Sequence, residues 1–114
     1  MNMNKSIQSA LEHYQSGNLR QAEDICLEIL KTQPDNVNIL NLLGMIYYSL
    51  QEHGSAVQYL TKALRNSPAN VNILYNLGNV YKDLKKADEA IIHYQKAVEM
   101  NTLRAKARSF YPLA

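Results

Sequence analysis

A repeat with a period of 34 residues is the feature that most constrains this chain. The segment Leu40-x-x-Leu43-Gly44-x-x-Tyr47 returns as Leu74-x-x-Leu77-Gly78-x-x-Tyr81, and the three residues before each copy, Val-Asn-Ile, are also identical. Self-similarity at a fixed period indicates that each copy is one supersecondary unit that packs against its neighbours. The chain is therefore expected to be an array of similar units.

Two helices are predicted within each unit. Pro34 and Pro68 set the frame, which gives repeats over residues 3–36, 37–70 and 71–104. In the second repeat, apolar residues at every third or fourth position predict helices over about 37–50 and 55–66.

Helix ends can also be predicted from the sequence. Asn36 and Asn70 precede the first helices of repeats two and three, where an asparagine is a good N-cap. Gly54 lies between the two helices of repeat two and is expected to supply the backbone freedom of that turn. The third repeat predicts helices over 71–84 and 87–100.

The two ends of the array depart from the pattern. Ser6 and His13 stand where later repeats have Leu and Tyr, so the first helix of repeat one is expected to bury less apolar surface. Residues 105–114 lack the Leu-Gly signature, and we expect a short helix there that covers the open end of repeat three. Such a segment is either a natural cap or a sign that the chain was cut from a longer protein.

Small residues at fixed positions indicate close helix packing. Gly44 and Gly78 let the first helix of a repeat approach the second, where Ala56 and Ala90 offer a small surface. Cys26 occupies the position of Leu60 and Tyr94 and is therefore expected to be a core residue.

Composition excludes several classes of protein. With 46% apolar and 19% charged residues the chain is expected to fold rather than to be disordered. It has no apolar run long enough to cross a bilayer and no secretory signal, so we expect a cytoplasmic protein without membrane insertion. The single cysteine fits a reducing compartment.

Charge is unevenly distributed along the chain. Residues 1–57 hold three Lys/Arg and six Asp/Glu, a net charge of −3, whereas residues 58–114 hold nine and four, a net charge of +5. The difference could steer an acidic partner towards the C-terminal half, or it could reflect ordinary solvated surfaces. Nucleic-acid binding is not expected, because the basic residues are not interleaved with exposed aromatic residues.

No arrangement of residues predicts catalysis. His13, His53 and His93 are 40 residues apart, out of phase with the repeat, so they are not expected to converge on a metal. No glycine-rich phosphate loop follows a strand. We therefore expect neither enzymatic activity nor a cofactor.

The spaced Leu-Gly-x-x-Tyr, Ala and Pro positions resemble the tetratricopeptide repeat over residues 3–104. Departures are Leu40 and Leu74 in the position of the family's tryptophan, and Thr102 in the position of the proline. The resemblance implies an all-α fold, a right-handed α-solenoid (superhelix) of antiparallel helix pairs. It also implies a single domain over 1–114, with residues 105–114 as the capping segment.

Members of this family usually act as scaffolds that bind an extended peptide or protein segment in a concave groove lined by the first helices. Helical geometry places one side of each first helix towards such a groove. The predicted groove residues are Asn38, Asn41, Met45, Tyr48, Asn72, Tyr75, Asn76, Asn79 and Lys82. In the first repeat the corresponding residues are Asn4, Ile7, Leu11 and Tyr14.

Three functional hypotheses follow. The first is a scaffold with a protein or peptide partner; the family's carboxylate clamp is missing, because Ile7, Leu11, Asn72 and Asn76 stand at its positions. The second is the substrate-recruiting arm of a larger enzyme, since Asn76 to Lys82 look like repeats of O-linked N-acetylglucosamine (O-GlcNAc) transferases. The third is self-assembly into a homo-oligomer through the terminal repeats, around Phe110 and Tyr111.

Overall fold

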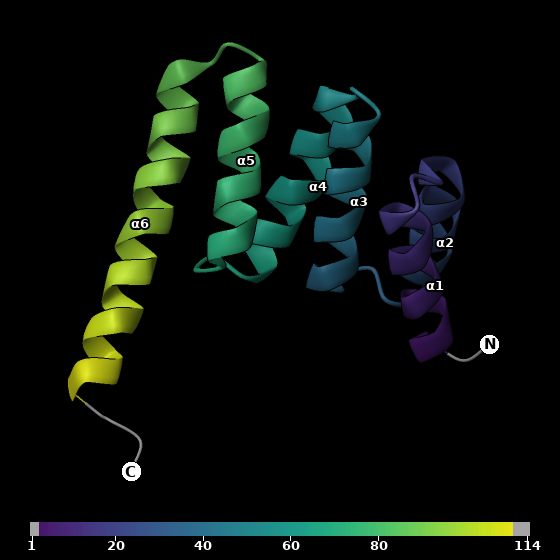
Figure 1. The fold of residues 1–114 in the computed structure, drawn as a ribbon, viewed down its shortest axis with the longest axis horizontal. Coiled ribbons are helices and arrows are strands. Elements are labelled where there is room, and N and C mark those ends of the chain that lie inside the picture. Colours follow the sequence, from purple (N-terminus) through teal and green to yellow (C-terminus); the bar gives the residue numbers. More distant parts are fainter. Residues whose placement is uncertain (1–2, 111–114) are drawn as a thin grey trace. The chain divides into compact units, whose positions relative to one another are not determined.

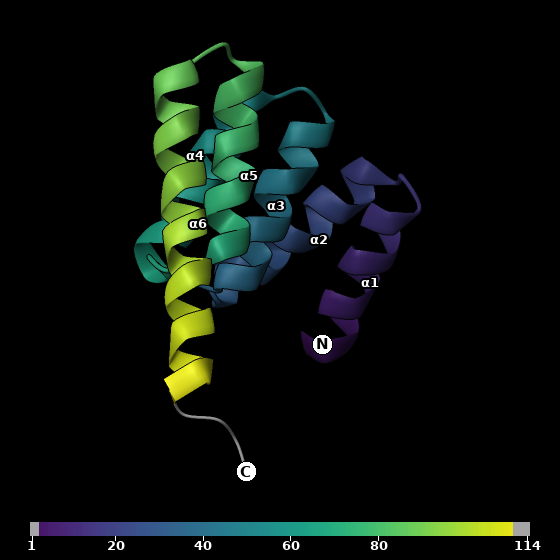
Figure 2. The ribbon, with the colours of Figure 1, turned by 60° about the vertical axis from the view of Figure 1, so that its left-hand side comes forward.

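Residues 3–110 are described by the computed structural model, and they form six α-helices without a strand among them (Figure 1 and Figure 2). Consecutive helices form three antiparallel pairs. Pair one is α1 (Met3–Gln15) and α2 (Leu19–Thr32), pair two is α3 (Val37–Ser49) and α4 (His53–Asn66), and pair three is α5 (Val71–Asp83) and α6 (Ala87–Phe110). The predicted all-α fold class is confirmed.

The chain divides into two compact units. Met1–Ser67 contains pairs one and two, and Pro68–Ala114 contains pair three. Within the first unit α2 packs against α3, and α1 also contacts α3, so pairs one and two share a core. The prediction of a single domain over residues 1–114 stays a prediction.

Asparagine caps begin α3 and α5, as predicted. The side-chain oxygen of Asn36 accepts a hydrogen bond from the backbone N–H of Ile39 at 3.1 Å, and Asn70 accepts one from Ile73 at 3.1 Å. Each bond satisfies one of the N–H groups that have no partner within the helix. The two caps explain why both helices begin at a valine that directly follows an asparagine.

The turn within each pair depends on a residue with positive φ. These residues are Gly17 (φ 82°), Gln51 (φ 63°) and Lys85 (φ 61°), which are 34 residues apart. In pair two the N–H of Glu52 donates to the carbonyl of Tyr47 at 2.8 Å, and the N–H of Gln51 donates to that of Tyr48 at 3.0 Å. This is the Schellman arrangement, which requires a left-handed residue just after the helix.

The expectation that Gly54 supplies this turn is therefore wrong. Gly54 lies in the first turn of α4, and its φ is not positive. The left-handed position falls at Gln51 because the two closing hydrogen bonds fix it immediately after the end of α3.

Glycine permits close contact within pairs two and three. A Cβ added at Gly44 would lie 2.5 Å from Cγ of Leu60, and one added at Gly78 would lie 2.5 Å from Cε1 of Tyr94. Both distances are far below van der Waals contact, which confirms the predicted role of these glycines. The atoms nearest to each added Cβ belong mainly to the large residue on the second helix, which is Leu60 in pair two and Tyr94 in pair three.

Pair one uses a different combination at the same positions. Ala10 corresponds to Gly44 and Cys26 corresponds to Leu60, and both are fully buried. As predicted, α1 buries little apolar surface: its buried residues are Ser6 and Ala10, whereas α3 buries six.

The last helix is longer than predicted. The helix α4 ends at Asn66, with Ser67 as its C-cap just before Pro68. In contrast, α6 continues through Thr102 to Phe110 because no proline stands at 102 to end it. Residues 105–110 continue α6 and residues 101–108 are exposed, so the short separate helix expected from residue 105 is not formed in this range. The side chain of Phe110, together with Tyr111 and the rest of the predicted cap, lies outside the described residues.

Candidate functional site

Four of the predicted binding residues share one side of α3. They are Asn38, Asn41, Met45 and Tyr48, spaced by three or four positions, and none is buried. The buried residues of the helix, including Leu40 and Leu43, turn towards the core. The Tyr48 ring packs edge-on against His53, with ring centres 5.7 Å apart, which limits the rotation of the tyrosine.

The neighbouring helix α1 adds a second set within the same unit. Asn4 and Leu11 are exposed and Ile7 and Tyr14 are half-buried, at the register positions that match the set on α3. Because α1 contacts α3, the two sets belong to neighbouring helices of one compact unit. The α1 set is the more apolar of the two.

The remaining predicted residues lie on α5. Asn72, Tyr75 and Lys82 are exposed, and Asn76 and Asn79 are half-buried. Two of them contact α6 through the same residue. The Tyr94 hydroxyl donates a hydrogen bond to the side-chain oxygen of Asn79, and the Tyr75 and Tyr94 ring centres are 6.0 Å apart.

Tyr94 therefore orients part of the α5 surface. Tyr94 occupies the position of Leu60 and Cys26, both of which are buried in their own pairs. Its aromatic body does pack against Gly78, but its hydroxyl reaches the edge of the helix and meets Asn79. The hydroxyl, which leucine lacks, was the signal in the sequence that could have indicated this role.

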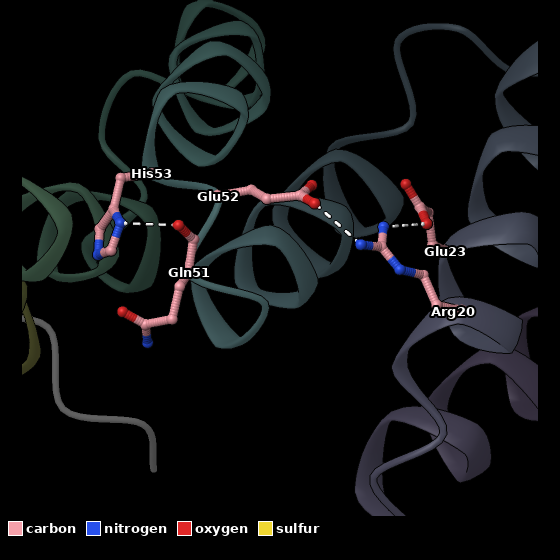
Figure 3. Close-up of polar contacts among 5 residues, drawn as sticks. All are labelled: Arg20, Glu23, Gln51, Glu52 and His53. Atoms are coloured by element: carbon pink, nitrogen blue, oxygen red, sulfur yellow. Dashed lines mark hydrogen bonds and ion pairs between the residues drawn. The ribbon is translucent and has the colours of Figure 1, made fainter.

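A polar network on the first unit was not predicted. Arg20 pairs with Glu23 at 3.0 Å and with Glu52 at 2.9 Å, and so joins α2 to the turn that begins α4 (Figure 3). In the same view, the carbonyl of Gln51 lies 3.2 Å from Nδ1 of His53. Arg20 and Glu52 are 32 residues apart, so no local spacing in the sequence indicates the pair.

Tyr47 extends this network into the core. A hydrogen bond with the Tyr47 hydroxyl lowers the pKa of the Glu23 carboxyl; burial opposes this shift, and Arg20 adds to it. Burial and the bond with Glu23 in turn raise the pKa of Tyr47. The Tyr47 ring also stacks on Tyr59 with centres 5.4 Å apart, so it ties α3 to both α2 and α4.

The described residues offer little for metal or nucleophilic chemistry. Within residues 3–110 no three His, Cys, Asp or Glu side chains gather closely enough to hold a metal ion. Burial raises the pKa of the Cys26 thiol to about 12, which leaves almost no reactive thiolate at neutral pH. None of the helices in this range combines the length and apolarity that crossing a membrane requires.

Solved structures with the same arrangement of helices include MamA. The MamA MSR-1 C2 structure aligns with a TM-score of 0.83 and 20% identity over 90% of this chain and 59% of that chain. A further crystal structure of MamA aligns with a TM-score of 0.81 and 22% identity over 85% of this chain and 57% of that one. At this identity the likeness concerns the fold.

A second kind of neighbour is an enzyme. A mutant O-GlcNAc transferase from Thermobaculum terrenum aligns with a TM-score of 0.79 and 28% identity over 88% of this chain but only 20% of that chain. This chain therefore spans less than two thirds of each of the two MamA chains and a fifth of the transferase, so it corresponds to part of each.

Comparison of sequences identifies the family. No curated protein sequence matches this chain. Tetratricopeptide repeat profiles, however, match residues 7–71 and residues 71–101, and together they cover most of each of the three helix pairs. The chain belongs to the tetratricopeptide repeat family.

Proposed function

We propose that this chain is a non-catalytic scaffold that binds an extended segment of a partner protein on the side of its first helices. The observation that carries the proposal is the row of unburied asparagine and adaptable apolar side chains along α3, next to the apolar set on α1. Protein binding is the general role of the tetratricopeptide repeat family. The proposal includes the concave groove in which the first helices would hold that segment.

The chemistry of the side chains suits a partner that is held partly through its backbone. An asparagine amide both donates and accepts hydrogen bonds, and so matches the N–H and C=O groups of an extended segment. Met45 and Leu11 offer apolar contact that adapts to different side chains. On the second unit, Asn72 and Lys82 of α5 offer an amide and a positive charge of their own.

A selection from displayed random peptides tests this proposal. Peptides that bind the intact chain should bind about tenfold more weakly to the double variant Asn38→Ala/Asn41→Ala, since two hydrogen bonds of about 0.5–1.5 kcal/mol are lost. Asn101→Ala, on the exposed part of α6, is the matched control and should leave binding unchanged. Equal binding by the α3 variant and the control would refute the assignment.

A second variant is needed to test whether the predicted residues on α5 bind the selected peptides. Asn79→Ala removes the acceptor for the Tyr94 hydroxyl and therefore alters packing as well as any binding. Asn72→Ala is cleaner, because Asn72 is exposed. If Asn72→Ala weakens binding of the selected peptides as Asn38→Ala/Asn41→Ala does, each unit takes part in binding.

A second candidate function is a substrate-recruiting arm of a larger enzyme. It is favoured by the 28% identity to the Thermobaculum terrenum O-GlcNAc transferase and by Asn76 and Asn79 on α5. The complete reading frame decides between the two candidates. A glycosyltransferase domain in the same frame would support the arm, and its absence would leave the scaffold.

A further inference from the structure

The helix α3 carries no charged side chain. None of its 13 residues is Asp, Glu, Lys, Arg or His. By contrast, α1 contains Lys5, Glu12 and His13, and α5 ends with Lys82 and Asp83. Of the three first helices, α3 is therefore the one on which a bound segment meets only uncharged groups.

The charged residues of α1 lie away from its proposed binding side. Lys5 and Glu12 are seven residues apart and share a side, which is roughly 100–120° around the helix from Leu11. Lys5 lines a hollow between α1 and α2. The His13 ring contacts Asn18 in the turn, with their side-chain nitrogens 3.3 Å apart. The side of α1 that contains Leu11 is therefore uncharged as well.

Apolar groups are accessible on these two uncharged sides. Leu11 is 41% exposed, and Met45, which stands at the same position one period later, is half-buried. Met45 keeps this accessibility although α1, α2 and α4 all contact α3. Because α1 and α3 are neighbours in one compact unit, Leu11 and Met45 can contact the same bound segment.

Such a lining distinguishes between the side chains of a partner. An aliphatic or aromatic side chain that leaves water to contact Leu11 and Met45 gains the free energy of apolar burial. A charged side chain at the same place loses hydration and finds no opposite charge to compensate it. The asparagine amides bond to backbone groups, which every sequence has, so they contribute little to this choice.

We propose that the first unit selects a partner segment by a large, uncharged apolar side chain that contacts Leu11 and Met45. This inference rests on the proposed function, because it concerns the same binding residues. It adds the class of the partner: an extended segment with an aliphatic or aromatic anchor residue that is flanked by backbone held through Asn38 and Asn41. Leu11 and Met45 are then the residues that determine specificity.

Peptides selected from a displayed random library on the intact chain test the anchor residue. The selected sequences should share a position restricted to residues such as Leu, Ile, Met or Phe. In fluorescence anisotropy with a labelled synthetic peptide, Lys or Glu at this position should each weaken binding more than about tenfold. Both charges should act alike, because the lining has neither sign. Selected peptides without an apolar position, or tight binding with either charge there, would overturn the inference.

A variant of the chain tests whether Leu11 contacts the anchor. Leu11→Glu should weaken binding of the selected peptide more than about tenfold, and it should bind the peptide with Lys at the anchor more tightly than the parent chain does. Leu103→Glu is the matched control, because Leu103 is a 57% exposed leucine on α6, and it should bind the selected peptide as the parent chain does. Equal effects of Leu11→Glu and Leu103→Glu would overturn the inference.

These experiments separate failure of this inference from failure of the proposed function. If no peptide is selected, or if Asn38→Ala/Asn41→Ala binds as its control does, the proposed function fails and the inference fails with it. If the selected peptides depend on the two asparagines but tolerate a charged anchor or ignore Leu11→Glu, the inference alone fails. Circular dichroism on Leu11→Glu and Leu103→Glu establishes that a loss of binding is not unfolding.

Discussion

Pairs one and two have the same backbone plan but fill the contact between their helices differently. In pair two Gly44 faces Leu60, and in pair one Ala10 and Cys26 occupy the same two positions. In pair two the small Gly44 on the first helix is thus matched by the large Leu60 on the second. In pair one the slightly larger Ala10 is matched by the smaller Cys26. The comparison teaches that in these two pairs the sizes of the two residues change in opposite directions, whereas pair three keeps the glycine and places a still larger residue, Tyr94, against it.

The largest loss of stability is expected from the substitution that adds most volume to this contact. Gly44→Leu adds a side chain where a single Cβ would already lie 2.5 Å from Leu60, and it should lower the free energy of unfolding by about 3 kcal/mol or more. Urea denaturation followed by circular dichroism measures the loss. Gly54→Ala is the control: no atom lies within 4 Å of the added Cβ, so it should be neutral or slightly stabilising. An unchanged midpoint for Gly44→Leu would show that the contact is not close-packed.

A compensating pair of changes sharpens the same comparison. Gly44→Ala should cost about 1–3 kcal/mol through overpacking, and Leu60→Cys should cost about 2 kcal/mol by leaving a cavity. The double variant recreates the combination of pair one, so the two costs should partly cancel. A double-mutant cycle should give a favourable coupling of about 1 kcal/mol or more. Simple additivity would show that the sizes of the two residues are not coupled.

Much of this packing could be predicted from the sequence, because it depends on features that repeat. The asparagine caps and the role of Gly44 each occur twice at the same period. The contact between Arg20 and Glu52 occurs once and depends on how α2 meets the turn before α4, so no spacing reveals it. The length of α6 depends on the lack of proline at 102, which only removes a stop signal and does not specify where the helix ends.

The side chains proposed to bind a partner could be placed only in part from the sequence. Helical geometry predicts that Asn38, Asn41, Met45 and Tyr48 share a side of α3, and the structure agrees that none of them is buried. It does not predict that Tyr94, a half-buried residue of α6, donates a hydrogen bond to the half-buried Asn79. Tyr94 does so towards Asn79 because its ring is longer than the leucine side chain at the same position in pair two.

A smaller effect is expected on the pH dependence of folding stability, and it should arise only at the contact between α2 and α3. The pKa of Glu23 is lowered in the folded chain, so Glu23 stabilises the fold above its unfolded pKa, and this contribution is lost as the pH falls through its folded pKa. Tyr47→Phe removes the main cause of the shift and should reduce the loss of stability between about pH 5 and pH 3 by about 1 kcal/mol. Thermal melts across this range measure it. Tyr81→Phe, one period later, where Val57 stands at the position of Glu23, should leave the pH dependence unchanged.

The smallest effect is expected at the turns, where pair one has glycine and pairs two and three do not. Gln51 and Lys85 adopt positive φ, which costs an ordinary side chain about 1 kcal/mol relative to glycine. Gln51→Gly should therefore stabilise the fold by about 0.5 kcal/mol, because glycine's greater freedom in the unfolded chain offsets part of the gain. Gly17→Gln, the reverse change at φ 82°, should destabilise it by a similar amount. Both can be measured as shifts of the urea midpoint at constant slope. If Gln51→Gly destabilised the chain, the glutamine side chain would have to contribute a contact that outweighs the backbone term. The three turns would then be equivalent in backbone conformation but not in the contribution of their side chains to stability.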